Sequence, residues 1–215
     1  MTTKADEQNI FDEIAPYYDK MNNLISFFTH KQIKKSAVKL LTVKENSNIL
    51  DICTGTGDII KILNKIAPNS KITGIDKSSK MLDIARKKKL NAKLVEGDAT
   101  KLDFSDETFD IVTSTFGLRN IENRKQALCE IYRVLKTGGE FLHLDFSNKN
   151  ILNKIFDIIT PITTLNSDKY IYLIKSKNNY PNADKIIEEF ESVGFKLKSK
   201  KYYFLKALCA QIMIK

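Results

Sequence analysis

The sequence lacks the features that would place it in a membrane or outside the cell. It contains no uninterrupted apolar run of the roughly 18–20 residues that a membrane helix needs. Its longest candidate, residues 155–165, is broken by Asp157 and Pro161. The first residues also lack the hydrophobic core of a secretion signal. We therefore expect a cytoplasmic protein. The alternative is a protein that is peripheral to the inner face of the membrane.

Cysteine is also scarce. The three cysteines, Cys53, Cys129 and Cys209, are odd in number and far apart in the sequence. Their spacing matches neither a set of metal ligands nor a disulfide framework. We expect separate buried thiols that pack as small hydrophobic side chains in a reducing compartment, and we expect no metal site.

Acidic residues are outnumbered by basic ones. The chain has 35 Lys and Arg against 26 Asp and Glu, which gives a net charge of +9, with basic clusters at 34–35, 86–89 and 196–201. A basic balance is typical of proteins that contact nucleic acid or an anionic membrane. A lysine-rich composition whose side chains only solvate helix faces gives the same count, so charge alone does not choose a partner.

What the sequence does contain is an alternation of strand and helix patterns. Strands alternate with helices through residue 146, which predicts a parallel sheet with right-handed crossovers. Two last strands, joined by a tight link at 205–206, predict a terminal antiparallel pair. The predicted strands are 49–52, 71–75, 92–96, 109–113, 140–146, 195–203 and 207–214; the predicted helices after the first strand begin near 59, 78, 124, 151 and 183.

The organisation predicted from these patterns is one α/β domain over residues 1–215. We find no internal repeat, linker or low-complexity tract. Residues 1–47 show helical spacing and predict a cap, with a break at Pro16. Residues 48–147 form the predicted cofactor-binding core, in which Gly138-Gly139 are expected to end a helix. Residues 148–215 hold the predicted substrate-side helices and the terminal strand pair.

The stretch from Asn48 to Asp58 lies at the first junction of strand and helix. Its aliphatic run is followed by Gly55 and Gly57, a pattern that brings backbone close to a ligand at a helix N-terminus. The alternative is a turn whose glycines serve steric needs only. Ile60 replaces the third glycine of the dinucleotide fingerprint, and the carboxylate of Asp51 would repel a pyrophosphate. The ammonium and sulfonium of S-adenosylmethionine would favour that charge, so we predict this ligand.

Two further acids end the next predicted strands. Asp76 lies 19 residues beyond Gly57, where a carboxylate can accept hydrogen bonds from both hydroxyls of a ribose. Asp98 closes the third strand and can accept from an adenine amino group, while the backbone N–H of Ala99 meets a ring nitrogen. The alternative for Asp98 is a helix or turn cap. Because ligands of open α/β sheets bind at the carboxyl ends of the strands, these acids predict one adenosine-type site.

The fourth strand ends in a polar run, Thr113 to Asn120, that is expected to face the group being transferred. It holds a Phe–Gly pair followed by Arg119 and Asn120. The alternative is a loop in which Arg119 forms a salt bridge with the N-terminal cap.

Together these residues resemble the ubiquinone/menaquinone biosynthesis C-methyltransferases, a branch of the class I S-adenosylmethionine-dependent methyltransferases. The resemblance runs over most of residues 11–147. Its specific parts are Tyr18-Asp19 with Met21-Asn22, and the run Phe116-Gly117-Leu118-Arg119-Asn120. It implies a Rossmann-like fold with a mostly parallel seven-stranded sheet, an antiparallel last strand and an N-terminal helical cap. It further includes Gly55-Thr56-Gly57-Asp58, Tyr132-Arg133-Val134-Leu135-Lys136 and Gly138-Gly139.

The resemblance also implies which residues form the site. Arg119 and Asn120 would lie at the substrate. From their place on the N-terminal cap, we expect Tyr18 and Asp19 to close over the cofactor. A ring carbon of a hydroquinone is methylated best after a phenolic proton is lost. Arg119 could stabilise the phenolate, and Asn120 could orient a water that removes the proton. We expect His143 to be a packed strand residue rather than the base. The implied cofactor contacts are Thr56, Asp76, Asp98, Ala99 and Thr115, and the predicted set is completed by Asp51, Gly55, Gly57, Lys77 and Met81.

The resemblance weakens in the regions expected to line the acceptor pocket. The segment around 160–172 is shorter than in the family, and 203–208 replaces a run of small residues. Phe28 and Ile33 stand where a glycine and a tryptophan are expected.

We predict an S-adenosylmethionine-dependent C-methyltransferase of a polyprenyl quinol, either demethylmenaquinol or a ubiquinone precursor. The alternative is a methyltransferase of another small molecule. A basic RNA-binding protein or RNA methyltransferase is disfavoured, because no platform of interleaved basic and aromatic residues is present. A fold with a dead site is disfavoured by the intact acids and glycines. The patterns do not predict an oligomeric state.

Overall fold

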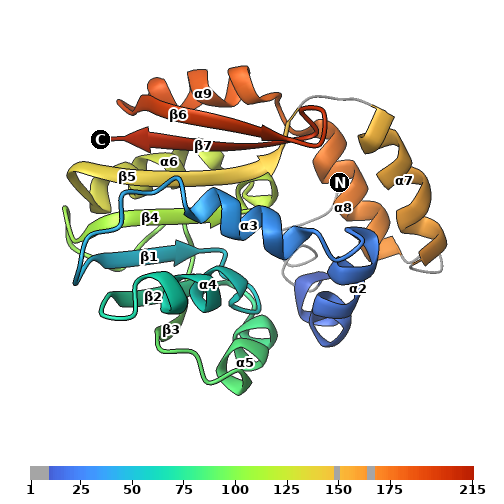
Figure 1. Ribbon diagram of the computed structural model, residues 1–215, viewed down its shortest axis with the longest axis horizontal. Coiled ribbons are helices and arrows are strands. Elements are labelled where there is room, and N and C mark those ends of the chain that lie inside the picture. Colours follow the sequence, from blue (N-terminus) through green and yellow to red (C-terminus); the bar gives the residue numbers. More distant parts are fainter. Residues whose placement is uncertain (1–9, 148–150, 164–167) are drawn as a thin grey trace.

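A seven-stranded sheet forms the centre of the molecule in the computed structural model, which describes residues 10–147, 151–163 and 168–215 (Figure 1). The strand order is β3-β2-β1-β4-β5-β7-β6. The chain enters at β1, moves outward to β3, and then crosses back to β4 on the other side of β1. The strands are β1 Asn48–Ile52, β2 Lys71–Asp76, β3 Lys93–Glu96, β4 Phe109–Thr115, β5 Leu135–Phe146, β6 Lys196–Tyr203 and β7 Leu208–Ile214.

The strand directions confirm the predicted sheet. Strands β3, β2, β1, β4 and β5 pair in parallel, whereas β7 pairs antiparallel with both β5 and β6. The turn at 204–207 joins the last two strands. The order reverses between β1 and β4, and a ligand of an open α/β sheet binds in the crevice at such a switch point.

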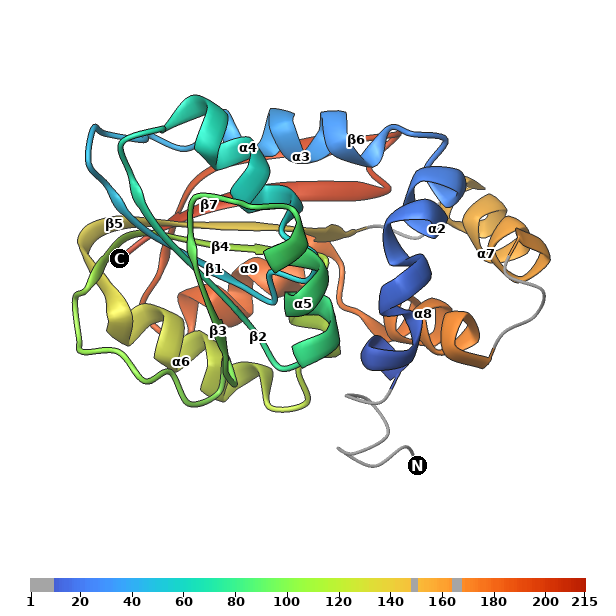
Figure 2. The same ribbon diagram turned by 90° about the horizontal axis from the view of Figure 1, so that it is seen from below.

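Helices cover both faces of the sheet (Figure 2). Helices α3 and α4 pack on one face, and α6 and α9 pack on the other. Strand β1 is buried between these layers, since Ile49 belongs to one hydrophobic cluster and Leu50 and Ile52 belong to the other. The helices are η1 Ala15–Tyr17, α2 Tyr18–Ile25, α3 His30–Val38, α4 Asp58–Ile66, α5 Ser79–Lys87, η2 Leu118–Asn120, α6 Arg124–Val134, α7 Ile151–Thr163, α8 Asp168–Asn179 and α9 Ala183–Glu191.

A small helical layer gathers beyond the carboxyl ends of the central strands. It combines α2 from the start of the chain with α7 and α8, and the three helices lie at the right of both views (Figures 1 and 2). Its core includes Ile14, Ile25 and Tyr170. Residues 1–9 of the predicted cap and 164–167 of the predicted shortened segment lie outside the described residues. The layer places segments from both ends of the chain over one edge of the sheet.

The structure differs from the sequence expectations at three places. Helix α6 ends at Val134, and Gly138-Gly139 lie inside β5 instead of ending the helix. A Cβ on Gly139 would lie 2.8 Å from the carbonyl oxygen of Lys136 and 3.0 Å from that of Asp110, so close backbone packing requires glycine there.

Helix α8 was not predicted. Its inward residues include Lys177, which is buried beside Asp157 at 2.8 Å and interrupts the apolar pattern. Cys129 is exposed rather than buried, because it faces away from the inward stripe of α6, which includes Leu128 and Ile131. Of the described helices, none is both long and apolar enough to cross a bilayer.

Candidate functional site

A cleft of about 640 Å³ lies at the carboxyl ends of β1, β2, β3 and β4. Seven of the ten predicted cofactor residues line it, as do Tyr18 and Asn120. Asp51, Thr56 and Gly57 do not line it. The seven lining residues are Gly55, Asp76, Lys77, Met81, Asp98, Ala99 and Thr115.

The glycine turn is fixed by the carboxylate at the end of β2. The backbone N–H of Gly55 donates to Oδ2 of Asp76 at 2.7 Å, and the N–H of Ser78 donates to Oδ1 at 2.9 Å. Burial raises the pKa of Asp76 although these N–H groups oppose the shift. Gly55 adopts φ +56°, and a Cβ there would meet no atom within 4 Å, so a ligand can approach the backbone. Each carboxylate oxygen can accept a second hydrogen bond from a ribose hydroxyl.

Asp51 lies behind the turn rather than in the cleft. Its Oδ2 accepts from the hydroxyl of Thr54 at 2.5 Å, and its Oδ1 accepts from that of Thr113 at 2.6 Å. Thr113 is the residue directly across from Asp51 in the pairing of β1 with β4. Burial raises the pKa of Asp51 to about 6, although both hydroxyls oppose the shift. The carboxylate therefore links the ends of β1 and β4. It does not contact the cleft, so its influence on a ligand there is electrostatic.

Thr56 connects the glycine turn to the cap. Its hydroxyl donates to Oδ1 of Asp19 at 2.6 Å, and Oδ2 of Asp19 pairs with Lys88 at 2.6 Å. A second link joins the buried Lys34 of α3 to Asp58, the first residue of α4, at 2.9 Å. These contacts hold α2 and α3 against the turn. They place Tyr18, the neighbour of Asp19, at the cleft.

Asp98 caps a turn at the far end of the cleft. Its Oδ1 accepts from both the N–H and the hydroxyl of Thr100 at 2.8 Å, and its Oδ2 pairs with Lys77 at 2.7 Å. Burial would raise the pKa of Asp98, but the bonds from Lys77 and Thr100 outweigh it and hold the pKa below its usual value. The capping alternative is thus observed, and Asp98 still lines the cleft together with Ala99.

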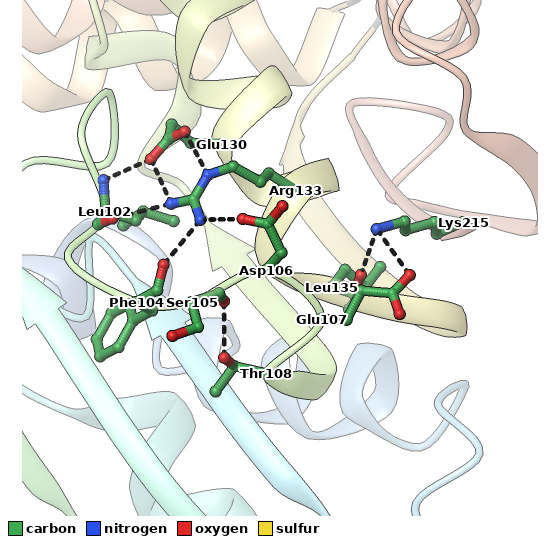
Figure 3. Close-up of polar contacts among 10 residues, drawn as sticks. All are labelled: Leu102, Phe104, Ser105, Asp106, Glu107, Thr108, Glu130, Arg133, Leu135 and Lys215. Carbon is green, nitrogen blue, oxygen red and sulfur yellow. Dashed lines mark hydrogen bonds and ion pairs between the residues drawn. The ribbon is translucent and has the colours of Figure 1, made fainter.

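An arginine clamp holds the loop that follows this turn (Figure 3). The guanidinium of Arg133 donates to the carbonyl oxygens of Leu102 and Phe104 at 2.9 and 2.8 Å, and it pairs with Glu130 and Asp106. Glu130 also accepts from the N–H of Leu102 at 2.8 Å. The clamp fixes residues 102–106 on α6 and so supports the wall formed by Asp98 and its neighbours.

A second cavity of about 380 Å³ opens beside the cleft, and Tyr18 and Phe116 line both. Most of its other lining residues are apolar and come from the helical layer and from the turn between β6 and β7. Phe116 adopts φ +57°, which turns its side chain to the boundary between the cavities. The lining includes Ile25, Phe27, Ile33, Arg119, Phe146, Ile155, Phe156, Ile159, Tyr170, Leu173 and Phe204.

Arg119 brings a positive charge to this apolar cavity. Its Nη1 donates to Oδ1 of Asp145 at 2.8 Å and to the carbonyl oxygen of Phe116 at 2.7 Å. The guanidinium carbon lies 5.3 Å from the ring centre of Phe146. The Nε atom is buried and has no hydrogen-bond partner among the described residues. The salt bridge of Arg119 therefore runs to β5 and not to the cap, and it fixes the guanidinium at the wall of this cavity.

Asn120 lies on the cleft side of the same loop. Its Oδ1 is buried and has no hydrogen-bond partner in the described part of the chain. His143 lines neither cavity: its Nδ1 lies 2.5 Å from Oε1 of Gln211 and its Nε2 lies 3.0 Å from the hydroxyl of Tyr180. The expectation that His143 is a packed strand residue is confirmed.

Sequence reasoning missed Asp145 and Lys34 as members of the site. Asp145 is fully buried in β5, and a carboxylate inside the apolar run 141–146 was the available signal. Lys34 lines the second cavity from α3. It carried no signal, because it is one of many lysines in an exposed-looking pattern.

Comparisons with known proteins find a family and relatives that cover most of the chain. The model of the ubiE/COQ5 methyltransferase family matches residues 1–215. A demethylmenaquinone methyltransferase of Listeria welshimeri is 37% identical over an alignment that covers 91% of this chain and 90% of the relative. The protein of the same name from Thermotoga maritima is 34% identical, with 94% of this chain and 93% of the relative covered.

Solved structures share the fold. An S-adenosylmethionine-dependent methyltransferase from Thermotoga maritima superposes with a TM-score of 0.73 at 21% identity, covering 96% of this chain and 99% of that one. A methyltransferase from Aquifex aeolicus gives 0.68 at 17% identity, with 92% and 98% covered. The [4+2]-cyclase SpnF gives 0.67 at 16% identity, with 86% and 80% covered. Since one of these three proteins is a cyclase, the fold alone does not select the reaction.

Proposed function

Because the chain belongs to the ubiE/COQ5 methyltransferase family, we propose that it transfers the methyl group of S-adenosylmethionine to a ring carbon of a polyprenyl quinol. The observation that carries the proposal is the meeting of two unlike cavities at Tyr18 and Phe116. The cleft at the strand ends is lined by carboxylates and by the backbone of Gly55, which a ligand can approach. The other is apolar and contains a guanidinium. Relatives with 34–37% identity are named demethylmenaquinone methyltransferases, which favours a naphthoquinol as the acceptor.

The residues of the first cavity fit S-adenosylmethionine. Asp76 would accept the ribose hydroxyls, and the wall at Asp98 and Ala99 would hold the adenine. The open backbone at Gly55 would face the methionine part, with Thr115 near the transferable group. When bound, the cofactor supplies an electrophilic methyl group on a sulfonium. Thr56 and Asp51 then act indirectly, because the first holds the cap and the second is buried under the turn.

The residues of the second cavity fit an ionised quinol. Aromatic and aliphatic side chains would receive the prenyl tail and the ring, and Arg119 would stabilise the phenolate that makes the ring carbon nucleophilic. From the cleft side of the same loop, Asn120 would orient a water that takes the phenolic proton. The apolar walls exclude bulk water, which strengthens the interaction between Arg119 and the phenolate.

Two experiments test the proposal in separate steps. Calorimetry with S-adenosylhomocysteine should show binding that weakens by about tenfold or more in Asp76→Ala. The matched control Asp83→Ala lies on the exposed side of α5 and should bind like the wild type. In a bacterial strain that lacks its own demethylmenaquinone methyltransferase, the wild-type gene should restore the methylated quinone and Arg119→Ala should not. Cofactor binding without restored quinone would support a methyltransferase of another small molecule.

A further inference from the structure

Exposed apolar side chains surround the second cavity. Phe27, Ile155 and Phe204 line that cavity and are also open to solvent. Beside them in the chain, Phe28 is 66% exposed and Leu205 is 76% exposed. Three separate segments contribute: the turn between α2 and α3, the helix α7, and the turn between β6 and β7. We call this set the apolar rim and define it as Phe27, Phe28, Ile155, Ile158, Phe204 and Leu205.

Both turns of the rim hold bulky residues in a disfavoured backbone conformation. Phe27 and Phe28 adopt φ of 47° and 62°, and Phe204 and Leu205 adopt φ of 48° and 51°. Glycine or asparagine would take this left-handed conformation at lower cost and would not expose apolar surface to water. At these positions the turns are therefore destabilised both by the backbone conformation and by the exposure of apolar surface to water. Strain of this kind persists where the arrangement serves a function.

Most charged residues near the rim in the sequence are lysines. Residues 20–44 and 192–215 each contain six lysines and no acidic residue. Lys31, Lys154 and Lys206 are exposed and lie within three residues of a rim residue in the sequence. Asp157, on α7 between the two rim isoleucines, is paired with Lys177 at 2.8 Å. An anionic lipid headgroup layer complements this arrangement, because each lysine near such a surface adds to the attraction.

We propose that the apolar rim docks on an anionic lipid membrane. Phe28 and Leu205 would enter the interface, the neighbouring lysines would contact headgroup phosphates, and the second cavity would open toward the bilayer. The inference rests on the proposed function in one respect, since a prenylated quinol is the ligand that would enter from the lipid. A protein that covered the rim would close the cavity, whereas a bilayer both covers the rim and supplies apolar ligands.

Co-sedimentation with vesicles tests the surface without any quinol. The full chain should sediment with phosphatidylglycerol vesicles, less with phosphatidylcholine vesicles, and less as salt increases. The double variant Phe28→Asn/Leu205→Asn should lower the partition coefficient by about tenfold or more. Asparagine tolerates the backbone at both positions, and neither residue lines a cavity. The control Ile66→Asn replaces an exposed residue at the far end of α4 and should partition like the wild type.

A second measurement separates this inference from the proposed function. Methyl transfer to a water-soluble naphthoquinol without a prenyl tail should be the same in the double variant and the wild type. Equal sedimentation of the two proteins, or no sedimentation of the wild type with phosphatidylglycerol, overturns the docking surface. The docking surface is also overturned if the double variant still binds vesicles but has a lower molar mass in solution than the wild type. The rim would then be an interface between two copies of this chain. Vesicle binding without any methyl transfer would instead contradict the proposed function.

Discussion

The guanidinium of Arg119, which lines the second cavity, and the carboxylate of Asp145 form an ion pair of 2.8 Å. Asp145 is fully buried, and the arginine side chain is almost so. The pair uses Nη1 and leaves Nε of Arg119 without a hydrogen-bond partner among the described residues. Asp145 thereby fixes the orientation of the Arg119 guanidinium.

Removing the charge of Asp145 should slow the methyl transfer without weakening the binding of the cofactor. In Asp145→Asn, we expect kcat to fall roughly tenfold to a hundredfold, because Arg119 loses its oriented partner. The KM for S-adenosylmethionine should stay within about twofold, since Asp145 does not line the cleft. Steady-state kinetics with both substrates varied would measure the difference. The control Asp83→Asn removes an exposed carboxylate and should change neither constant; an unchanged kcat in Asp145→Asn would contradict the role of Asp145.

The link between the cap and the glycine turn should appear as coupling between Asp19 and Thr56. Each of Asp19→Ala and Thr56→Ala breaks the same 2.6 Å hydrogen bond, so the double variant should lose little more than either one. The expected coupling is about 1 kcal/mol in the binding free energy of S-adenosylhomocysteine. Calorimetry of the wild type, both single variants and the double variant completes the cycle. Strictly additive losses would show that this contact does not hold the cap over the cofactor.

The burial of Asp51 predicts an unusual dependence of stability on pH. Its pKa in the folded state is about 6, above the ordinary value of about 3.9 for an unfolded chain. The folded state therefore binds more protons between these values, and the contribution of Asp51 to stability falls as pH rises through this window.

Urea unfolding of the wild type and Asp51→Asn isolates this contribution from those of other acids. From pH 5 to pH 7.5 the wild type should lose roughly 1 kcal/mol of unfolding free energy relative to the variant. A difference that stays constant, or that grows in favour of the wild type, would mean that Asp51 has no raised pKa.

The arginine clamp of Figure 3 should be sensitive to a conservative change. Lysine cannot reach two carbonyl oxygens and two carboxylates at once, so Arg133→Lys should lower the unfolding free energy by about 2 kcal/mol. Arg86→Lys changes an exposed pair with Asp83 and should cost less than about 0.5 kcal/mol. Chemical denaturation measures both. Equal losses would show that the clamp does not stabilise the loop after Asp98.

The parts of the site that sequence predicts best are those fixed by the ends of strands. Gly55, Asp76 and Asp98 each follow an apolar run, and the rule that parallel strands end at one edge brought them to one cleft. The same rule does not say which way a side chain points at the strand end. Asp51 points to Thr113 across the sheet, and Thr56 points to the cap, so neither lines the cleft.

Contacts between distant segments were beyond local reasoning. Arg119 finds Asp145 on the next strand of the sheet, and no spacing in the sequence encodes that pairing. The inward face of helix α8 includes a buried lysine, Lys177, whose partner Asp157 lies on α7. Because this lysine interrupts the apolar pattern, the helical periodicity of α8 is not visible in the sequence. Phe28 and the stretch 203–208 could be read as departures from the family, but only the structure brings Phe27 and Phe204 to one cavity.

Transfer of a radiolabelled methyl group from S-adenosylmethionine to demethylmenaquinol tests the central claim most directly. The reduced acceptor should be labelled by the wild type, the oxidised quinone should not, and Arg119→Ala should lose roughly a hundredfold or more of the rate. A ubiquinone precursor and a lysate of small molecules, assayed in parallel, compare the other acceptors. No label in either quinol, together with label in another small molecule, would contradict the account.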